Sequence, residues 1–80
     1  MPNPSRNRQS PPLIALGKAL RQMRLEKGIS QENLALLAEV DRSYVGRVER
    51  GDNNAALLTL VKLTKALGTS VAKLMRKAKL

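Results

Sequence analysis

The sequence predicts an all-α fold built from five helices, and three observations lead to this prediction. Hydrophobic residues make up 42% of the 80 positions, yet Tyr44 is the single aromatic residue, so the core must consist of aliphatic side chains. Such a composition favours helices. Apolar residues recur at helical spacing along most of the chain, and no stretch alternates with a period of two over the length of a strand. A chain of this size forms one domain at most.

The composition also limits the kinds of site that the protein can carry. Cysteine and histidine are both absent, which removes disulfides, zinc fingers, thiol nucleophiles and imidazole acid–base chemistry. We therefore expect no metal, no cofactor and no enzymatic activity. No apolar run approaches the roughly 18 residues of a membrane span, and the N-terminal residues lack the apolar stretch of a secretory signal. These features predict a cytoplasmic protein that is not inserted in a membrane.

The charge balance is strongly basic, with a formal net charge of +9 and an isoelectric point near 11.0. Such an excess suits phosphate backbones and, less specifically, any anionic surface. Residues 28–54 hold three arginines against five acidic residues, so the excess lies in the first helix, the C-terminal third and the N-terminal tail.

Residues 1–12 contain all four prolines and bury nothing, so we expect a flexible N-terminal arm ahead of a domain over residues 13–80. The arm is either a solvated tail or a segment whose Arg6 and Arg8 reach DNA, as minor-groove arms do.

The first predicted helix begins at Leu13 and ends at Gly28, which is suited to a left-handed C-cap. Its apolar stripe consists of Leu13, Leu16, Leu20 and Met23. Gly17 inside this helix costs about 1 kcal/mol relative to Ala, and its presence suggests that another backbone passes closely.

Two short helices follow. Ser30 is a good N-cap for a second helix from Gln31 to near Glu39. We expect its inward side chains to be Leu34, Leu37 and Ala38. Asp41 caps a third helix, Arg42 to Arg50, which Gly51 closes. Its inward side chains are Val45 and Val48.

The last two predicted helices are strongly patterned. The fourth is closed by Gly68, and its periodic run comprises Leu57, Leu60, Val61, Leu63, Thr64 and Leu67. Ser70 caps a fifth helix from Val71 to about Ala78, in which Leu74 and Met75 are apolar. Its basic residues are Lys73, Arg76, Lys77 and Lys79.

The connection between the second and third helices is too short for a side-by-side hairpin, so these helices should cross at a wide angle. Such a crossing needs a small residue where the axes come nearest, and Ala35 occupies that place. The segments "LRQMRLEKGISQENLALLA", "VDRSYVGRVERG" and "LLTLVKLTKALGTSVAKLM" occur in this order. The chain thereby resembles the lambda-repressor-like helix-turn-helix family, also called the XRE family, over residues 13–76. Within it, the third helix is most similar to those of restriction–modification controller proteins.

The resemblance implies a compact five-helix fold whose third helix enters the major groove of double-stranded DNA. By position, it implies base contacts from Arg42, Ser43 and Arg47 and backbone contacts from Gln31, Tyr44, Asn53 and Asn54. Arginine forks bind guanine O6 and N7 together, and such a pair gives about 1–3 kcal/mol of discrimination. Tyr44 has two other possible roles, to touch a thymine methyl or to cover the domain edge, and asparagines are also ordinary loop residues. Asp52 should turn away from phosphate.

The resemblance also suggests an ion pair between Arg24 and Glu49, which would tie the first helix to the third. A lone carboxylate next to inward Val48 would be costly, which favours the pair. The sequence departs from the family pattern at three places. Glu39 replaces a glycine of the turn, at a cost of about 1–2 kcal/mol if the position is left-handed. Asn33 and Ala55 replace a capping acid and a proline.

We expect a homodimer, because one short helix contacts only a few base pairs. The fifth helix offers a dimer face through Val71, Leu74, Met75 and Leu80, unless these side chains only complete the monomer core.

The function predicted is therefore a dimeric, sequence-specific transcriptional regulator of a (pseudo)palindromic operator. Within that class, a restriction–modification controller, a phage-type repressor and an antitoxin with a toxin partner are alternatives. A protein-interaction adaptor that has lost DNA binding would not need Arg42 and Arg47. Attachment of the basic fifth helix to an anionic membrane is disfavoured by the absence of Trp and Phe.

Overall fold

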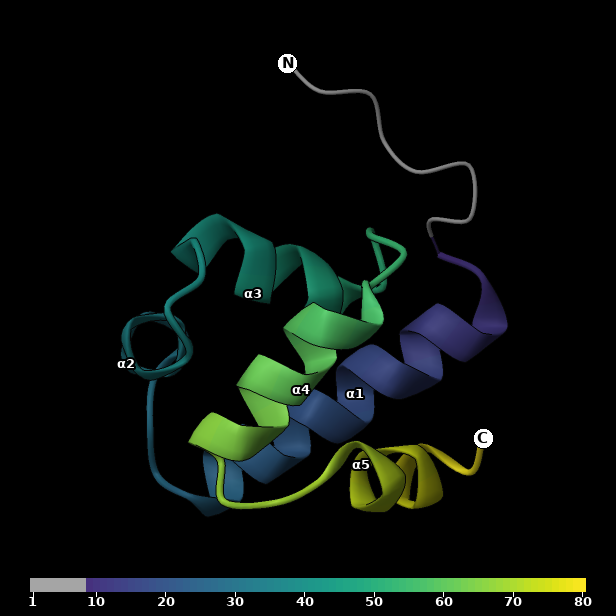
Figure 1. The fold of residues 1–80 in the computed structure, drawn as a ribbon. Helices are drawn as coiled ribbons and strands as arrows, with labels where there is room; N and C mark the ends of the chain where they lie inside the picture. The colour runs from purple at the N-terminus through teal and green to yellow at the C-terminus, as the bar shows by residue number, and fades with distance from the viewer. Residues whose placement is uncertain (1–8) are drawn as a thin grey trace.

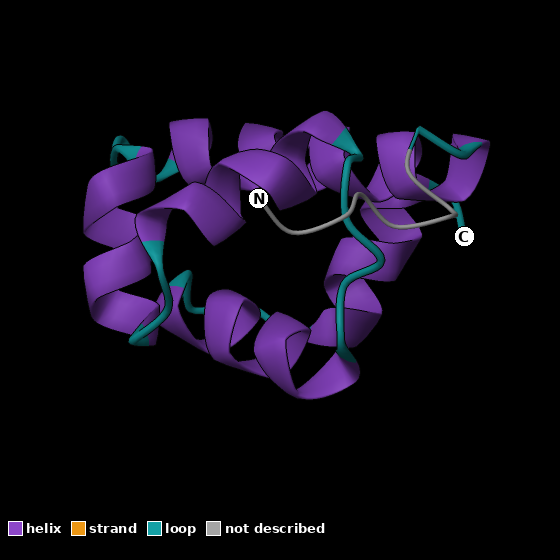
Figure 2. Cartoon of the chain, turned by 90° about the horizontal axis from the view of Figure 1, so that it is seen from above, coloured by secondary structure: helices purple, strands orange, loops and turns teal. Residues whose placement is uncertain are grey.

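The computed structural model describes residues 9–80, which form five α-helices. These are α1 (Pro11–Glu26), α2 (Gln31–Ala38), α3 (Arg42–Arg50), α4 (Leu57–Ala66) and α5 (Val71–Ala78). Figure 2 shows that this part of the chain consists of helices and loops, without a strand. The all-α, five-helix prediction is confirmed. Most of the predicted arm, including Arg6 and Arg8, lies outside the described residues.

The N-terminal helix begins at Pro11, two residues before the predicted start at Leu13. Proline is compatible with the first helical turn because its missing N–H has no partner there. Gln9 precedes this helix in a left-handed conformation, with φ of 62°. Its N–H donates to the carbonyl of Gly51 at 2.6 Å, and its side-chain amide donates to the carbonyl of Arg50 at 2.9 Å. The chain entering α1 is therefore attached to the C-terminal end of α3.

The helices enclose one aliphatic core. Helix α1 packs against α3 and α5, and α2 packs against α3 and α4. In Figure 1, α3 lies along the upper edge, with α4 below it and α5 at the lower edge. All five helices contribute buried apolar side chains, which are Leu16, Ala19, Leu20, Leu34, Ala35, Ala38, Val45, Val48, Leu60, Leu63, Leu67 and Leu74.

The turn between α2 and α3 brings the two helices together at the wide angle that the sequence predicts. Glu39 is left-handed, with φ of 58° and ψ of 44°. Figure 1 shows α2 end-on and α3 lengthwise, so their axes cross at a wide angle. Ala35, which the sequence analysis expects at the crossing, is 3% exposed. Ser30 accepts a hydrogen bond from the N–H of Asn33, and Asp41 accepts one from the N–H of Ser43, so both predicted N-caps are present.

The prediction that Leu37 points inward is wrong, because this side chain is 62% exposed. The buried residues of α2 are Leu34, Ala35 and Ala38. At 100° per residue, the mean direction of these three lies roughly 100° away from that of Leu37. A helix of two turns packs along one narrow face, and Leu37 falls on its flank.

Helix α4 is also exposed on one side. Its core-facing residues are Leu60, Leu63 and Thr64. Leu57 and Val61, which belong to the predicted periodic run, are 65% and 43% exposed. Leu58 is 76% exposed. We call Leu57, Leu58 and Val61 the α4 apolar face.

Candidate nucleic-acid interface

Helix α3 has two different faces. Val45 and Val48 are 0% and 1% exposed and fix one face in the core. Arg42 and Ser43 are exposed, and Arg47 is half-buried. Helix α3 lies at the edge of the molecule (Figure 1), and its polar face includes the exposed side chains of Arg42 and Ser43. The three residues expected to contact bases therefore lie on the outward side of one short helix.

The guanidinium of Arg47 is held by its neighbours. Its Nη1 lies 3.5 Å from Oγ of Ser43, one turn earlier in α3. Its Nε donates to the side-chain oxygen of Asn53 at 3.1 Å, in the amide orientation that satisfies both ends of Asn53. In that orientation the amide nitrogen of Asn53 donates to the carbonyl of Asp52 at 3.2 Å. The opposite orientation would place oxygen against acceptors and nitrogen against donors, which is why the surrounding groups assign this one.

The remaining expected backbone contacts differ in accessibility. Asn54 is exposed in the loop after α3, next to half-buried Asn53. Tyr44 is half-buried and packs against the core. Tyr44 lines a depression together with Val40, Asp41, Arg47 and Thr59. Tyr44 thus covers the edge of the domain beside Arg47, which is one of the roles expected from the sequence.

The predicted ion pair joins Arg24 of α1 to Glu49 of α3. Nε and Nη2 of Arg24 donate to the two carboxylate oxygens at 2.7 and 3.0 Å, and the side chains are 8% and 2% exposed. The remaining Nη1 donates to the carbonyl of Ile29 at 2.9 Å. The hydrogen bond to Glu49 raises the pKa of Arg24 above its ordinary value, so the Arg24 guanidinium stays charged at neutral pH.

Gln31 joins this pair to the start of α2. Its amide nitrogen donates to Oε1 of Glu49 at 2.9 Å, and the residue is half-buried. An amide nitrogen carries two hydrogens, so one is used inside the protein and the second is the side-chain donor available to a phosphate. Glu49 of α3 is consequently hydrogen-bonded to a side chain of α1 and to a side chain of α2.

The residues expected at a dimer face are divided by the structure. Leu74 is fully buried and belongs to the core of a single chain. It is not available to a partner, because α5 packs against α1 through it. Val71 and Met75 are partly buried against the core, and Leu80 is 56% exposed. Sequence reasoning missed the α4 apolar face, although Leu58 was apolar and lay off the predicted stripe.

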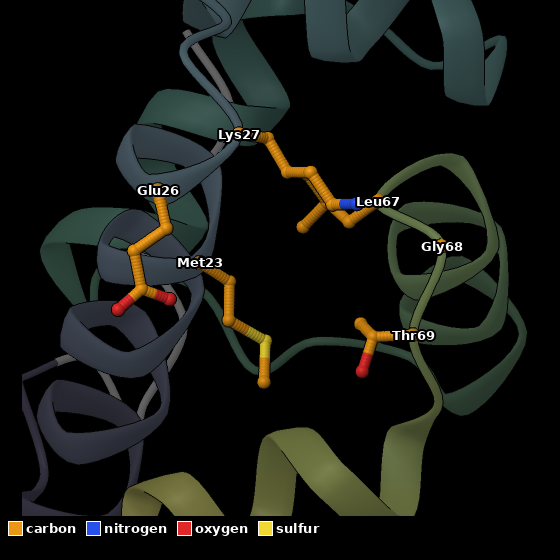
Figure 3. Close-up of a pocket in the computed structure, with 6 residues that line it drawn as sticks. All are labelled: Met23, Glu26, Lys27, Leu67, Gly68 and Thr69. Carbon is orange, nitrogen blue, oxygen red and sulfur yellow. The ribbon is translucent and has the colours of Figure 1, made fainter.

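A further pocket, of about 310 Å³, lies between the end of α1 and the turn after α4. Figure 3 shows its lining residues, which are Met23, Glu26, Lys27, Leu67, Gly68 and Thr69. It lies at the end of the molecule away from α3 (Figure 1), so it is separate from the polar face of that helix.

None of the five helices of residues 9–80 is both long enough and apolar enough to cross a membrane. In the same part of the chain, no three acidic, histidine or cysteine side chains are grouped as ligands for a metal ion.

This chain is similar to known helix-turn-helix proteins. The family model described as "Helix-turn-helix" matches residues 20–74. Control protein C.SmaI of Serratia marcescens is 45% identical over 60 residues, which cover 75% of this chain and 71% of that protein. Control protein C.BamHI of Bacillus amyloliquefaciens is 41% identical over 56 residues, covering 69% of each.

Solved structures are similar in fold and sequence. The restriction-modification controller protein C.AhdI from Aeromonas hydrophila matches with a TM-score of 0.76 and 48% identity, over 78% of this chain and 94% of that one. The clp gene regulator ClgR from C. glutamicum matches with a TM-score of 0.82 and 35% identity, over 85% of this chain and 87% of that one.

Proposed function

Since this chain belongs to the XRE-type helix-turn-helix family and has its lambda-repressor-like fold, we propose that it is a sequence-specific transcriptional regulator. It binds a (pseudo)palindromic operator as a homodimer, with α3 of each copy in the major groove. The observation that carries this proposal is the outward polar face of α3, formed by Arg42, Ser43 and Arg47 on a helix whose other face is buried.

The chemistry of these side chains suits base recognition. Arg42 and Arg47 each offer a planar fork for guanine, and Ser43 offers a hydroxyl to either kind of base. The two arginines are five residues apart, which corresponds to about 7.5 Å along the helix axis. They therefore contact different base pairs of the same half-site.

Affinity comes mainly from charge. Exposed lysines and arginines outside α3 supply long-range attraction to phosphates, which depends strongly on salt. Asn54 and the second N–H of the Gln31 amide act as local phosphate donors at the two ends of the interface. Tyr44 supports Arg47 from the domain edge and contacts the neighbouring phosphate or thymine.

We assign the homodimer contact to the α4 apolar face rather than to α5. A short helix in one copy contacts too few base pairs for useful specificity, so a second copy is needed. Leu57, Leu58 and Val61 are exposed next to each other on one helix, which is the kind of surface that symmetric dimers bury. Val71, Met75 and Leu80 of α5 form the competing face.

The relatives' names favour one biological role among those open from the sequence. They are control proteins and a restriction-modification controller, so we propose control of a restriction–modification operon rather than action as an antitoxin. The protein acts in the cytoplasm, where its operator is, and by binding without catalysis.

Selection of bound sequences from random DNA duplexes tests the proposal. The wild-type protein should recover a symmetric motif, and Arg42→Ala should relax the choice at particular base pairs by about 5- to 150-fold. Arg21→Ala is the matched control, because it removes the same charge from an exposed position on α1. It should lower affinity and leave the motif unaltered. Equal losses without any change of motif in both variants would reduce the interaction to charge attraction.

A further inference from the structure

We propose that Asn53 is a specificity-determining residue that positions the guanidinium of Arg47 before DNA is bound. This inference rests on the proposed function, because it concerns how the DNA-facing side of α3 is organised. Asn53 itself need not touch a base. Its effect passes through Arg47, so it is a positioning residue.

Nε of Arg47 donates a hydrogen bond to the side-chain oxygen of Asn53, at 3.1 Å. An arginine can offer guanine two different edges, one formed by Nε and Nη2 and one formed by Nη1 and Nη2. Nε carries one hydrogen, which Asn53 occupies, whereas Nη1 carries two and keeps one free beside the one directed at Ser43. The edge formed by Nη1 and Nη2 is therefore the one presented. Asn53 thus selects one approach of the fork to the base.

The loop that holds Asn53 is itself fixed. Gly51 is left-handed, with φ of 77°, and turns the chain back over the last turn of α3. The N–H of Asp52 then donates to the carbonyl of Arg47 at 2.9 Å. The carboxylate of Asp52 accepts from Nε of Arg50 at 3.0 Å and from the side-chain amide of Gln9. Asn53 is therefore carried on a braced turn rather than on a loose loop.

Both ends of the Asn53 amide are used within the protein. The oxygen accepts from Arg47, and the nitrogen donates to the carbonyl of Asp52 at 3.2 Å. The sequence suggested instead that Asn53 donates to phosphate. A phosphate contact and a positioning role predict different results, because a phosphate contact carries no sequence information.

The test compares the sequence preferences of Asn53→Ala, Arg47→Ala and the double variant, by selection from random duplexes. Asn53→Ala should lower discrimination by about 3- to 10-fold at the same base pair that Arg47→Ala affects. It should leave the base pair that depends on Arg42 unchanged. In the double variant, Asn53→Ala should add no further loss of discrimination to that of Arg47→Ala.

Asn54→Ala is the matched control, because the neighbouring asparagine is exposed. It should weaken all sequences alike. A second readout uses the protein without DNA. In NMR spectra, the Nε–H of Arg47 should exchange with water faster in Asn53→Ala than in the wild type, and Asn54→Ala should not change that rate.

These experiments distinguish a failure of the positioning role of Asn53 from a failure of the proposed function. If Asn53→Ala weakens every sequence equally while Arg47→Ala still alters the motif, the positioning role is wrong and the proposed function stands. An unchanged exchange rate at Arg47 would also overturn the positioning role. A wild-type protein that selects no motif at all would overturn the proposed function instead.

Discussion

The carbonyl oxygen of Val48 lies too close to Gly17 for a Cβ atom at that position to fit. The carbonyl oxygen of Glu49 lies 2.5 Å from the point that this Cβ atom would occupy. Helices α1 and α3 therefore touch backbone to backbone, and the contact holds α3 against the centre of the fold. It accounts for a glycine inside α1, where that residue costs about 1 kcal/mol relative to Ala.

The substitution Gly17→Ala should lower the free energy of unfolding by about 2 kcal/mol or more, because the new methyl group meets backbone atoms that cannot rotate away. Helix propensity alone predicts the opposite, a gain of about 1 kcal/mol. Urea denaturation followed by circular dichroism measures the difference. Lys18→Ala, at the exposed neighbouring position, should change stability by less than about 0.5 kcal/mol.

Removal of the Glu49 carboxylate should destabilise the protein more than removal of the exposed Glu26 carboxylate. Glu49→Ala leaves Arg24 buried without its carboxylate, and such a loss costs about 3–5 kcal/mol. The control is Glu26→Ala, which removes the exposed pair with Lys77, 3.7 Å apart, at a cost of about 0–1 kcal/mol. Equal costs for the two variants in urea denaturation would show that the buried pair adds nothing.

A glycine at position 39 should stabilise the protein. Glu39 is left-handed, with φ of 58°, a conformation that costs a residue with a side chain about 1 kcal/mol relative to glycine. Glu39→Gly should therefore raise the free energy of unfolding by roughly 0.5–1 kcal/mol. Glu39→Ala removes the same carboxylate and keeps the backbone strain, so it should give no such gain. A gain of equal size in both variants would point to the carboxylate instead.

The proposed dimer contact predicts that Leu58→Glu weakens self-association about tenfold or more, since an exposed leucine buried in an interface contributes about 1.5–3 kcal/mol. Sedimentation equilibrium over a range of concentrations measures the dissociation constant. Leu80→Glu places the same charge on α5 and should have little effect. A dimer lost through Leu80→Glu and kept in Leu58→Glu would assign the contact to α5.

Local signals were sufficient to predict most of the fold. Ser30, Asp41 and Ser70 cap their helices through side-chain oxygens, and each can be recognised from a few neighbouring residues. Gly28, Gly51 and Gly68 follow the helices that they were expected to end, and all have positive φ. The order and type of the helices follow from these caps together with the spacing of apolar residues.

Features that depend on contacts between helices, or between a loop and a helix, were not predictable in the same way. Leu37 and Leu74 look alike in pattern, yet one is exposed and the other is fully buried. The difference arises from which neighbouring helix lies over each, and spacing within one helix does not contain that information. Asn53 lies six residues after Arg47, in a loop, and its contact exists because the turn at Gly51 folds back over α3.

The attachment of Gln9 to the carbonyl groups of Arg50 and Gly51 has a practical consequence for engineering this protein. A purification tag joined directly to Gln9 would start beside the C-terminal end of α3, the helix that we propose to enter the major groove. A tag fused after Leu80 starts from α5, at the lower side of the molecule in Figure 1. Fluorophores and immobilisation handles are therefore better placed at that end.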